Sequence, residues 1–184
     1  MIAKQAFRLP HGRDFTVHDL ASIPYDGNRY ELVDGILVVS PPPGYLHQAT
    51  LMSLMSLMHD PCPPGMELVV GPVAVRPDET TELWPDMIVA RTEDVTEDNL
   101  PTAPLLAIEI ITPSSELYDR HIKRAAYRKM GTAHYWVVDP VTPSVTVFEL
   151  AHDNYEQVAE VTGGEAFEAT QPFPVRIVPA ELLD

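Results

Sequence analysis

The chain has 184 residues, a length that suits one domain with a sizeable hydrophobic core. Its 12 Lys and Arg residues stand against 27 Asp and Glu residues, which gives a formal net charge of −15 at pH 7. This charge excludes a general electrostatic attraction to nucleic acid or to an anionic membrane as the main activity.

The single cysteine, Cys62, excludes an internal disulfide and a cysteine-based zinc site. The most apolar run, residues 105–111, is too short to span a membrane. Residues 1–13 mix charged and polar groups and lack the apolar core of a signal peptide. We therefore expect a soluble, cytoplasmic protein that does not bind membranes.

Turn and capping residues define the first predicted elements. Thr16, with Asp19 in the capping-box position, predicts a brief helix that ends at Leu20. The segments 29–33 and 36–40 flank Asp34-Gly35, a dipeptide typical of a tight hairpin turn.

A longer helix is predicted over residues 45–59, where apolar residues recur at helical spacing. Met52 and Leu57 make this helix apolar on most sides, so we expect it to be sandwiched in the core. Residues 66–70 and 73–76 are interpreted as a pair of strands.

Two further strands are predicted over residues 84–90 and 105–111. The second is apolar on both faces, which is typical of a central strand covered by helices on both sides. A helix from about residue 116 to 130, closed by Gly131, follows it. Residues 133–138 and 144–150 form a last hairpin, and the remainder from Ala151 on carries little visible chemistry. This order favours an α/β fold with a mixed sheet flanked by helices.

Two acidic residues interrupt segments that are otherwise apolar. Glu109 lies within the strand at 105–111, and Asp86 stands at the start of the apolar segment 87–90. A buried carboxylate must be paired, protonated or bound to a metal. Either acid can be structural, with Asp86 capping a turn and Glu109 meeting a buried cation. Two such acids on different strands favour an oxygen-rich site for Mg²⁺ or Mn²⁺.

The helix predicted after Glu109 carries the main group of basic residues. Helical spacing places Ile122 on its inward half, with Asp119 and Lys123 at the border of that half. A row of arginines lies along the opposite side: Arg120, Arg124 and Arg128. This is the one local patch that could meet a polyanion. The alternative is an ordinary solvated helix face with an Asp119–Lys123 pair.

Two carboxylates and a lysine are the groups that metal-assisted phosphodiester hydrolysis requires. Asp86 and Glu109 would fix a divalent ion, which polarises the phosphate and lowers the pKa of bound water. Lys123 would orient or activate that water and offset developing negative charge, and Asp119 would steer Lys123.

Several motifs, taken in order, resemble the Uma-type family of restriction-endonuclease-like proteins. They are Tyr30-Glu31-Leu32-Val33-Asp34-Gly35, Ser40-Pro41-Pro42 with His47, Pro85-Asp86, Ala107-Ile108-Glu109-Ile110-Ile111-Thr112-Pro113-Ser114-Ser115, then Asp119, Lys123 and Tyr127, and Tyr135-Trp136-Val137-Val138-Asp139-Pro140. The resemblance covers about residues 25–150. It implies a branch of the PD-(D/E)XK nuclease superfamily, with a mixed sheet flanked by helices, extra β-hairpins and DNA as the substrate.

The resemblance also implies roles for individual residues. Asp86 is the acid of the Pro-Asp motif, and Glu109 is the acid of the second half-motif. The superfamily pattern places a lysine two residues after that acid, where this chain has Ile111. Lys123, on the following helix, matches the family position that takes over its role.

Two more matching positions leave alternatives open. Glu31 is either an additional acidic ligand or water-orienting group of the site, or an exposed acid on a hairpin strand. His47 is either a core histidine with its hydrogen bonds satisfied or a phosphate contact.

We therefore expect one domain over residues 1–184 that acts as a Mg²⁺- or Mn²⁺-dependent endonuclease on DNA. Arg120, Arg124 and Arg128 would steer the DNA backbone as a local patch, because the overall charge is unfavourable. Opposing cuts by a small nuclease usually need two active sites, so we also expect a homodimer. Two other readings stay open: a catalytically silent nuclease fold that binds a protein partner, and a hydrolase of a smaller phosphate ester.

Overall fold

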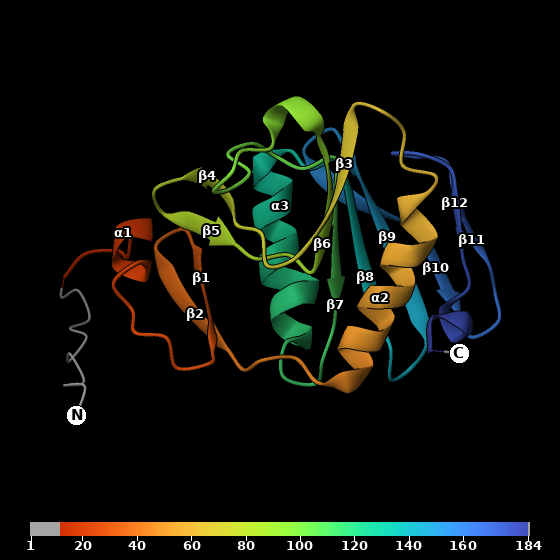
Figure 1. Cartoon of the computed structure of the whole chain (residues 1–184), viewed down its shortest axis with the longest axis horizontal. Helices are drawn as coiled ribbons and strands as arrows, with labels where there is room; N and C mark the ends of the chain where they lie inside the picture. Colours follow the sequence, from red (N-terminus) through yellow and green to blue (C-terminus); the bar gives the residue numbers. More distant parts are fainter. Residues whose placement is uncertain (1–11, 184) are drawn as a thin grey trace.

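The computed structural model describes residues 12–183 and contains two main sheets of unequal size (Figure 1). The large sheet has the strand order β10-β9-β8-β7-β6-β3. Its strands are β3 (Met66–Val70), β6 (Met87–Arg91), β7 (Leu106–Ile110), β8 (His134–Asp139), β9 (Ser144–Ala151) and β10 (Asn154–Thr162).

The small sheet has the order β2-β1-β5-β4, and a third, two-stranded sheet lies near the C-terminus. The strands of these sheets are β1 (Arg29–Val33), β2 (Ile36–Ser40), β4 (Val75–Asp78), β5 (Thr81–Leu83), β11 (Phe167–Ala169) and β12 (Val175–Ile177). The helical segments are α1 (Val17–Leu20), α2 (Tyr45–His59), η1 (Thr92–Asp94), η2 (Tyr118–Lys123), α3 (Arg124–Met130) and η3 (Pro179–Leu183). Among the described residues, no helix combines the length and apolarity that a membrane crossing requires.

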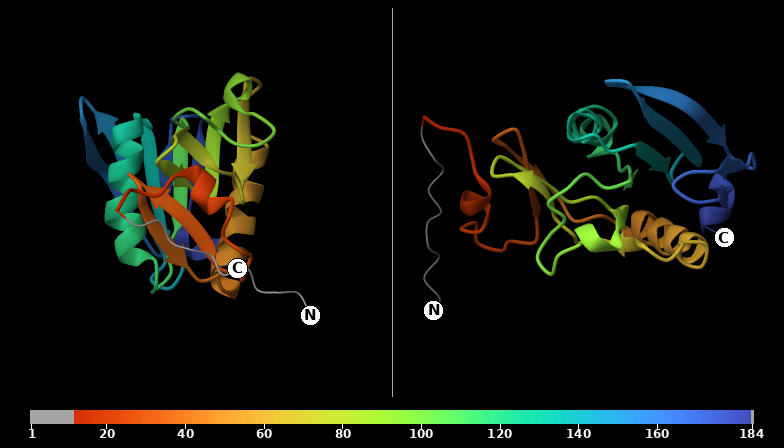
Figure 2. Two further views of the ribbon diagram at one scale, coloured as in Figure 1. Left: turned by 90° about the vertical axis from the view of Figure 1, so that its left-hand side faces the viewer. Right: turned by 90° about the horizontal axis from the view of Figure 1, so that it is seen from above.

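The central strand of the large sheet is β7, which pairs antiparallel with β6 and parallel with β8. Leu106, Ile108 and Ile110 join the hydrophobic cluster that includes α2. The alternate residue Ala107 joins a second cluster with Tyr127 of α3. The right-hand view of Figure 2 shows α2 and α3 on opposite sides of this sheet. The predicted mixed sheet with helices on both faces is therefore confirmed.

The first hairpin and the long helix have the bounds expected from the sequence. Asp34 and Gly35 both have positive φ values, 49° and 77°, as a type I′ turn between β1 and β2 requires. The expectation that residues 45–59 are sandwiched in the core is wrong, because the side of α2 that carries Met52 and Leu57 faces solvent. These residues are 59% and 41% exposed.

The predicted pairing of residues 66–70 with 73–76 is also wrong. β3 pairs with β6 of the large sheet, whereas β4 pairs with β5 of the small sheet. The cause is the short strand β5, which follows β4 after a tight turn in which Asp78 accepts the Thr80 backbone N–H. Three residues are too few to show a period-2 pattern in the sequence.

The helix predicted over residues 116–130 is divided into the π-helix η2 and the α-helix α3. A π turn closes with i→i+5 hydrogen bonds, so it is wider than an α turn and brings residues five apart to one side. Tyr118 and Lys123 therefore both point inward, and Ile122, expected inside, is 48% exposed. The predicted end at Gly131 is confirmed, with its φ of 88° in the left-handed region.

Residues after Ala151 form more structure than the sequence indicated. β10 pairs along its whole length with β9, and β12 and η3 both pack against α2. The alternation of polar and small apolar residues in β10 leaves one of its faces in solvent, which weakens the sequence signal for a strand.

Candidate active site

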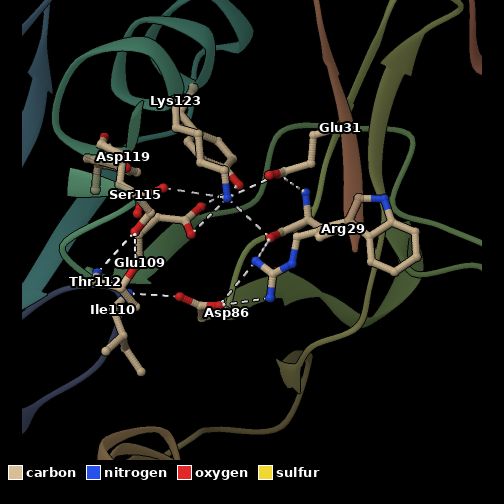
Figure 3. Close-up of polar contacts among 12 residues, drawn as sticks. Arg29, Glu31, Asp86, Glu109, Ile110, Thr112, Ser115, Asp119 and Lys123 are labelled. Atoms are coloured by element: carbon tan, nitrogen blue, oxygen red, sulfur yellow. Dashed lines mark hydrogen bonds and ion pairs between the residues drawn. The ribbon is translucent and has the colours of Figure 1, made fainter. Parts of the chain in front are cut away.

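A cleft of about 130 Å³ lies between β1, the segment at residues 41–44 that leads into α2, and the end of β7. Six residues that the sequence singled out line this cleft, and each is at most 5% exposed. They are Glu31, His47, Asp86, Glu109, Asp119 and Lys123. Figure 3 labels five of them, all except His47. The structure thus brings together residues that lie up to 92 positions apart in the chain, from Glu31 to Lys123.

The two acids of the strand motifs lie side by side on neighbouring strands. Glu109 is on β7, and Asp86 comes directly before β6, whose Met87 pairs with Ile108. The backbone N–H of Ile110 donates a hydrogen bond to Asp86 Oδ2 at 2.8 Å. Glu109 faces α3, because it alternates with the residues that face α2. The antiparallel register of β6 and β7 therefore positions both carboxyl groups in the cleft.

Lys123 is the cation at the centre of the cluster. Its Nζ lies 2.9 Å from Glu109 Oε2 and 3.1 Å from Glu31 Oε1. The side chain is 1% exposed, and the same Nζ donates to the backbone oxygen of Trp84 at 3.2 Å. Asp119 Oδ1 is 3.8 Å away, one helical turn before the lysine. The structure therefore places Glu31 as a buried partner of Lys123 and not as an exposed acid.

The ionisation of this cluster follows from burial and from its charges. Burial opposes the charged form of Lys123, but Glu109, Glu31 and Asp119 outweigh it and hold the lysine pKa well above its usual value. Burial raises the pKa of Glu109 well above its usual range, and the neighbouring carboxylates raise it further, although Lys123 opposes this. Lys123 is therefore an ammonium group that donates hydrogen bonds.

Asp86 is held by groups from three elements. His47 Nε2 on α2 lies 2.9 Å from Asp86 Oδ2, and Arg29 on β1 lies 3.4 Å from Oδ1. Burial favours the neutral acid, but the hydrogen bond from His47 and the charges of His47, Lys123 and Arg29 lower the pKa of Asp86. His47 thus contacts the site through Asp86, a role that neither sequence-based alternative described.

Sequence reasoning missed two residues that contact the cluster. Arg29 lies on the same face of β1 as Glu31, and this spacing of two residues was the signal that could have identified it. Tyr127 is fully buried, and its hydroxyl donates to Glu109 Oε1 at 3.3 Å. No sequence signal distinguishes such a tyrosine from an ordinary core residue.

The three arginines of the helix do not line the cleft as it is formed by the described residues. Arg120 pairs with Glu116 at 3.2 Å, and Arg124 lies 4.6 Å above the Phe148 ring. Arg128 donates to the backbone oxygen of Asp153 at 2.8 Å. Contact between these arginines and DNA stays a prediction.

The oxygen donors of the cleft are suited to a hard divalent cation. Four carboxyl groups, those of Glu31, Asp86, Glu109 and Asp119, stand against the cations Lys123 and Arg29. Within residues 12–183, no three His, Cys, Asp or Glu side chains already form a metal-binding group. Binding of a divalent ion by Asp86 and Glu109, with water as the other ligand as is usual for Mg²⁺, stays a prediction.

Burial should make the charged form of Asp119 destabilising at neutral pH. Burial raises the pKa of Asp119 to about 6, so folding favours its neutral form. The stabilisation that this neutral form provides is complete below about pH 3.9, the pKa of an aspartic acid side chain in an unfolded chain. It is lost as the pH rises through 6. We expect Asp119→Asn, in EDTA at pH 8, to raise the free energy of unfolding by about 1–3 kcal/mol.

Urea denaturation at pH 8 and pH 4.5 measures this effect, and the gain should shrink at the lower pH because Asp119 is then mostly protonated in the fold. Asp98→Asn, at an exposed position, serves as the control and should change little. An Asp119→Asn protein that is less stable than wild type at pH 8 would contradict this account of the cluster.

Comparisons with known proteins give matches that cover most of the chain. The model of the Uma2 family, described as "Putative restriction endonuclease", matches residues 17–181. The crystal structure of a protein from Anabaena variabilis, described as a putative nuclease belonging to DUF820, has a TM-score of 0.74 at 18% identity. The match covers 92% of this chain and 97% of that one, and it shows that the two share a fold. No curated protein matches. The chain belongs to the Uma2 family.

Proposed function

We propose that this chain is a metal-dependent endonuclease that hydrolyses phosphodiester bonds in DNA. The observation that supports this most directly is the buried lysine, Lys123, among the carboxylates of the cleft, next to two acids on adjacent strands. The family to which the chain belongs favours a nuclease in general, and the chemistry of the cleft favours metal-assisted hydrolysis.

Each residue of the cleft has a part in this proposal. A divalent ion held by Asp86 and Glu109 supplies polarisation of the phosphate and a bound water of lowered pKa. Lys123, held by Glu31 and Asp119, orients the attacking water and offsets the negative charge that develops on the phosphate. His47 keeps the carboxyl group of Asp86 in place.

The test is cleavage of supercoiled plasmid, linear duplex and single-stranded DNA at low salt with Mg²⁺, Mn²⁺ or EDTA. We expect cleavage with either metal and none in EDTA. Because the metal-free cleft holds more carboxylates than cations, we also expect DNA to bind more weakly in EDTA. We further propose a homodimer, which linearisation of plasmid without accumulation of nicked circles would support.

Other outcomes of this test point to the alternatives. No cleavage together with no stabilisation of the protein by Mn²⁺ would contradict the proposal and favour a silent module that binds a protein partner. Stabilisation by Mn²⁺ that Glu109→Gln removes, without cleavage of any DNA, would favour a smaller phosphate ester as the substrate.

A further inference from the structure

A second cavity, of about 420 Å³, adjoins the catalytic cleft on the side of α1 and the small sheet. Its volume lies within the range of roughly 300–1,000 Å³ typical of pockets that hold small molecules. Its lining is mostly apolar and includes three aromatic residues: Tyr25, Tyr30 and Trp84. We call it the aromatic pocket.

The aromatic pocket and the cleft share walls. Arg29, Pro42 and Pro43 line both cavities. The two cavities are therefore direct neighbours, so one ligand molecule that passes over these residues can contact both.

Trp84 connects the two cavities through its backbone and its side chain. Its backbone N–H donates to Glu31 Oε1 at 2.7 Å, and its backbone oxygen accepts from Lys123 at 3.2 Å. Its indole lines the aromatic pocket, where Nε1 donates to Glu82 Oε1 at 2.9 Å. Trp84 thus contacts Lys123 through its backbone, and its indole is held in the aromatic pocket by Glu82.

The aromatic pocket also contains a buried carboxyl group, that of Glu82, which is held by hydrogen bonds. Glu82 is 4% exposed, and its Oε2 accepts from Arg76 Nε at 2.7 Å. The Arg76 side chain is 37% exposed, and a guanidinium has five N–H donors in all, so it can donate to a ligand as well. An aromatic surface beside cationic donors fits a nucleobase, which has a π face and acceptor atoms on its edge.

We propose that the aromatic pocket binds a nucleobase that has left the base stack, from the strand whose phosphate lies in the cleft. The proposal rests on the proposed function, because the phosphate in the cleft brings the base to the pocket. Stacking on an aromatic side chain contributes roughly 5- to 150-fold in affinity per base. A base must be unpaired to reach the pocket, so the preferred substrate is single-stranded or locally unpaired DNA.

The first experiment measures base binding without cleavage. The sequence contains two tryptophans, Trp84 and Trp136, and Trp136 is fully buried in the core, where it packs against Phe167. The protein should therefore give two indole N–H resonances in a ¹H–¹⁵N NMR spectrum, of which Trp84→Phe removes one. Titration with deoxyadenosine in EDTA should shift the Trp84 resonance and leave the Trp136 resonance in place.

Deoxyribose 5-phosphate, which has no base, serves as the control ligand and should shift neither resonance. An unchanged Trp84 resonance at millimolar deoxyadenosine would overturn the proposal, as would an equal shift caused by deoxyribose 5-phosphate. This titration needs neither metal nor cleavage, so it is independent of the proposed nuclease activity. If the protein binds the base but cuts no DNA, the proposed nuclease activity is refuted and the proposed base-binding pocket is supported.

The second experiment measures the effect on cleavage of single-stranded DNA. Trp84→Ala should raise KM by at least about 5-fold, with a smaller change in kcat. Trp84→Phe should restore most of the loss because it keeps an aromatic surface. Equal KM values for the alanine and phenylalanine variants would contradict stacking on this residue.

Discussion

Replacing Lys123 with methionine is expected to lower the free energy of unfolding by about 3–5 kcal/mol at pH 7. The ammonium group is the shared partner of Glu109 and Glu31, which are each 1% exposed. Its removal leaves these carboxyl groups buried without their nearest cation. A loss of this size is a large part of the total stability of a typical domain. Chemical denaturation in EDTA, followed by circular dichroism, measures it.

A second substitution tests the cause of this loss. Adding Glu109→Gln to Lys123→Met removes one of the unpaired carboxyl groups, so the double variant should recover about half or more of the lost stability. Lys129→Met, at an exposed lysine that pairs with Asp34, is the matched control and should cost less than about 0.5 kcal/mol. A Lys123→Met protein as stable as wild type would show that the cluster does not need its cation. Loss of cleavage in any lysine variant has to be interpreted beside its stability.

Replacing Asp86 with asparagine is expected to reduce metal-dependent cleavage by a factor of about 10²–10⁴ while the protein stays folded. The amide is nearly isosteric with the carboxyl group, and its oxygen can still accept the hydrogen bond from the Ile110 backbone N–H. The change removes the negative charge that would hold the cation. Initial rates of plasmid cleavage in Mg²⁺ measure the effect.

The control for this variant is Asp98→Asn, which makes the same chemical change at an exposed position and should cleave at the rate of wild type. Thermal denaturation of each protein, with and without Mn²⁺, separates loss of metal binding from loss of the fold. Cleavage by Asp86→Asn at the wild-type rate would refute the assignment of Asp86 as a metal ligand.

The candidate site could be identified from the sequence where polar residues conflict with their surroundings. Asp86 and Glu109 could be identified because a buried carboxylate in an apolar segment needs a partner. Apolar strands also pack side by side in the centre of a sheet, which brings two such acids together. Glu31 needed the resemblance to a family, since an acid on a hairpin strand has no such conflict. Arg29 could have been found from its spacing to Glu31 alone.

Other features depend on contacts that no local pattern encodes. β4 pairs with β5, and β10 pairs with β9. Both pairings depend on tertiary contacts and not on the local sequence. Lys123 lies one turn before the buried Tyr127 of α3 and so points inward, whereas the π turn changes the directions of the residues before it, which a spacing of 100° per residue over the whole helix does not describe. Elements with strong periodicity, such as the helix over residues 45–59, were predicted with their true bounds because periodicity is a local signal.

The π turn at η2 has a consequence for how such a site can arise in evolution. One residue more or less in this turn rotates the residues before it by about 100° relative to those after it, while α3 keeps its packing on the sheet. A single-codon insertion or deletion in this turn therefore changes the directions of Tyr118 and Asp119, while Lys123 keeps its direction because it directly precedes α3 and lies one turn before the buried Tyr127. Ile111, which directly follows β7 and is 4% exposed, stands two residues after Glu109, so the chain has no lysine at that position. The length of one turn can thus change which residues before Lys123 face the cleft, and neither the lysine nor the acids of the two strands need move.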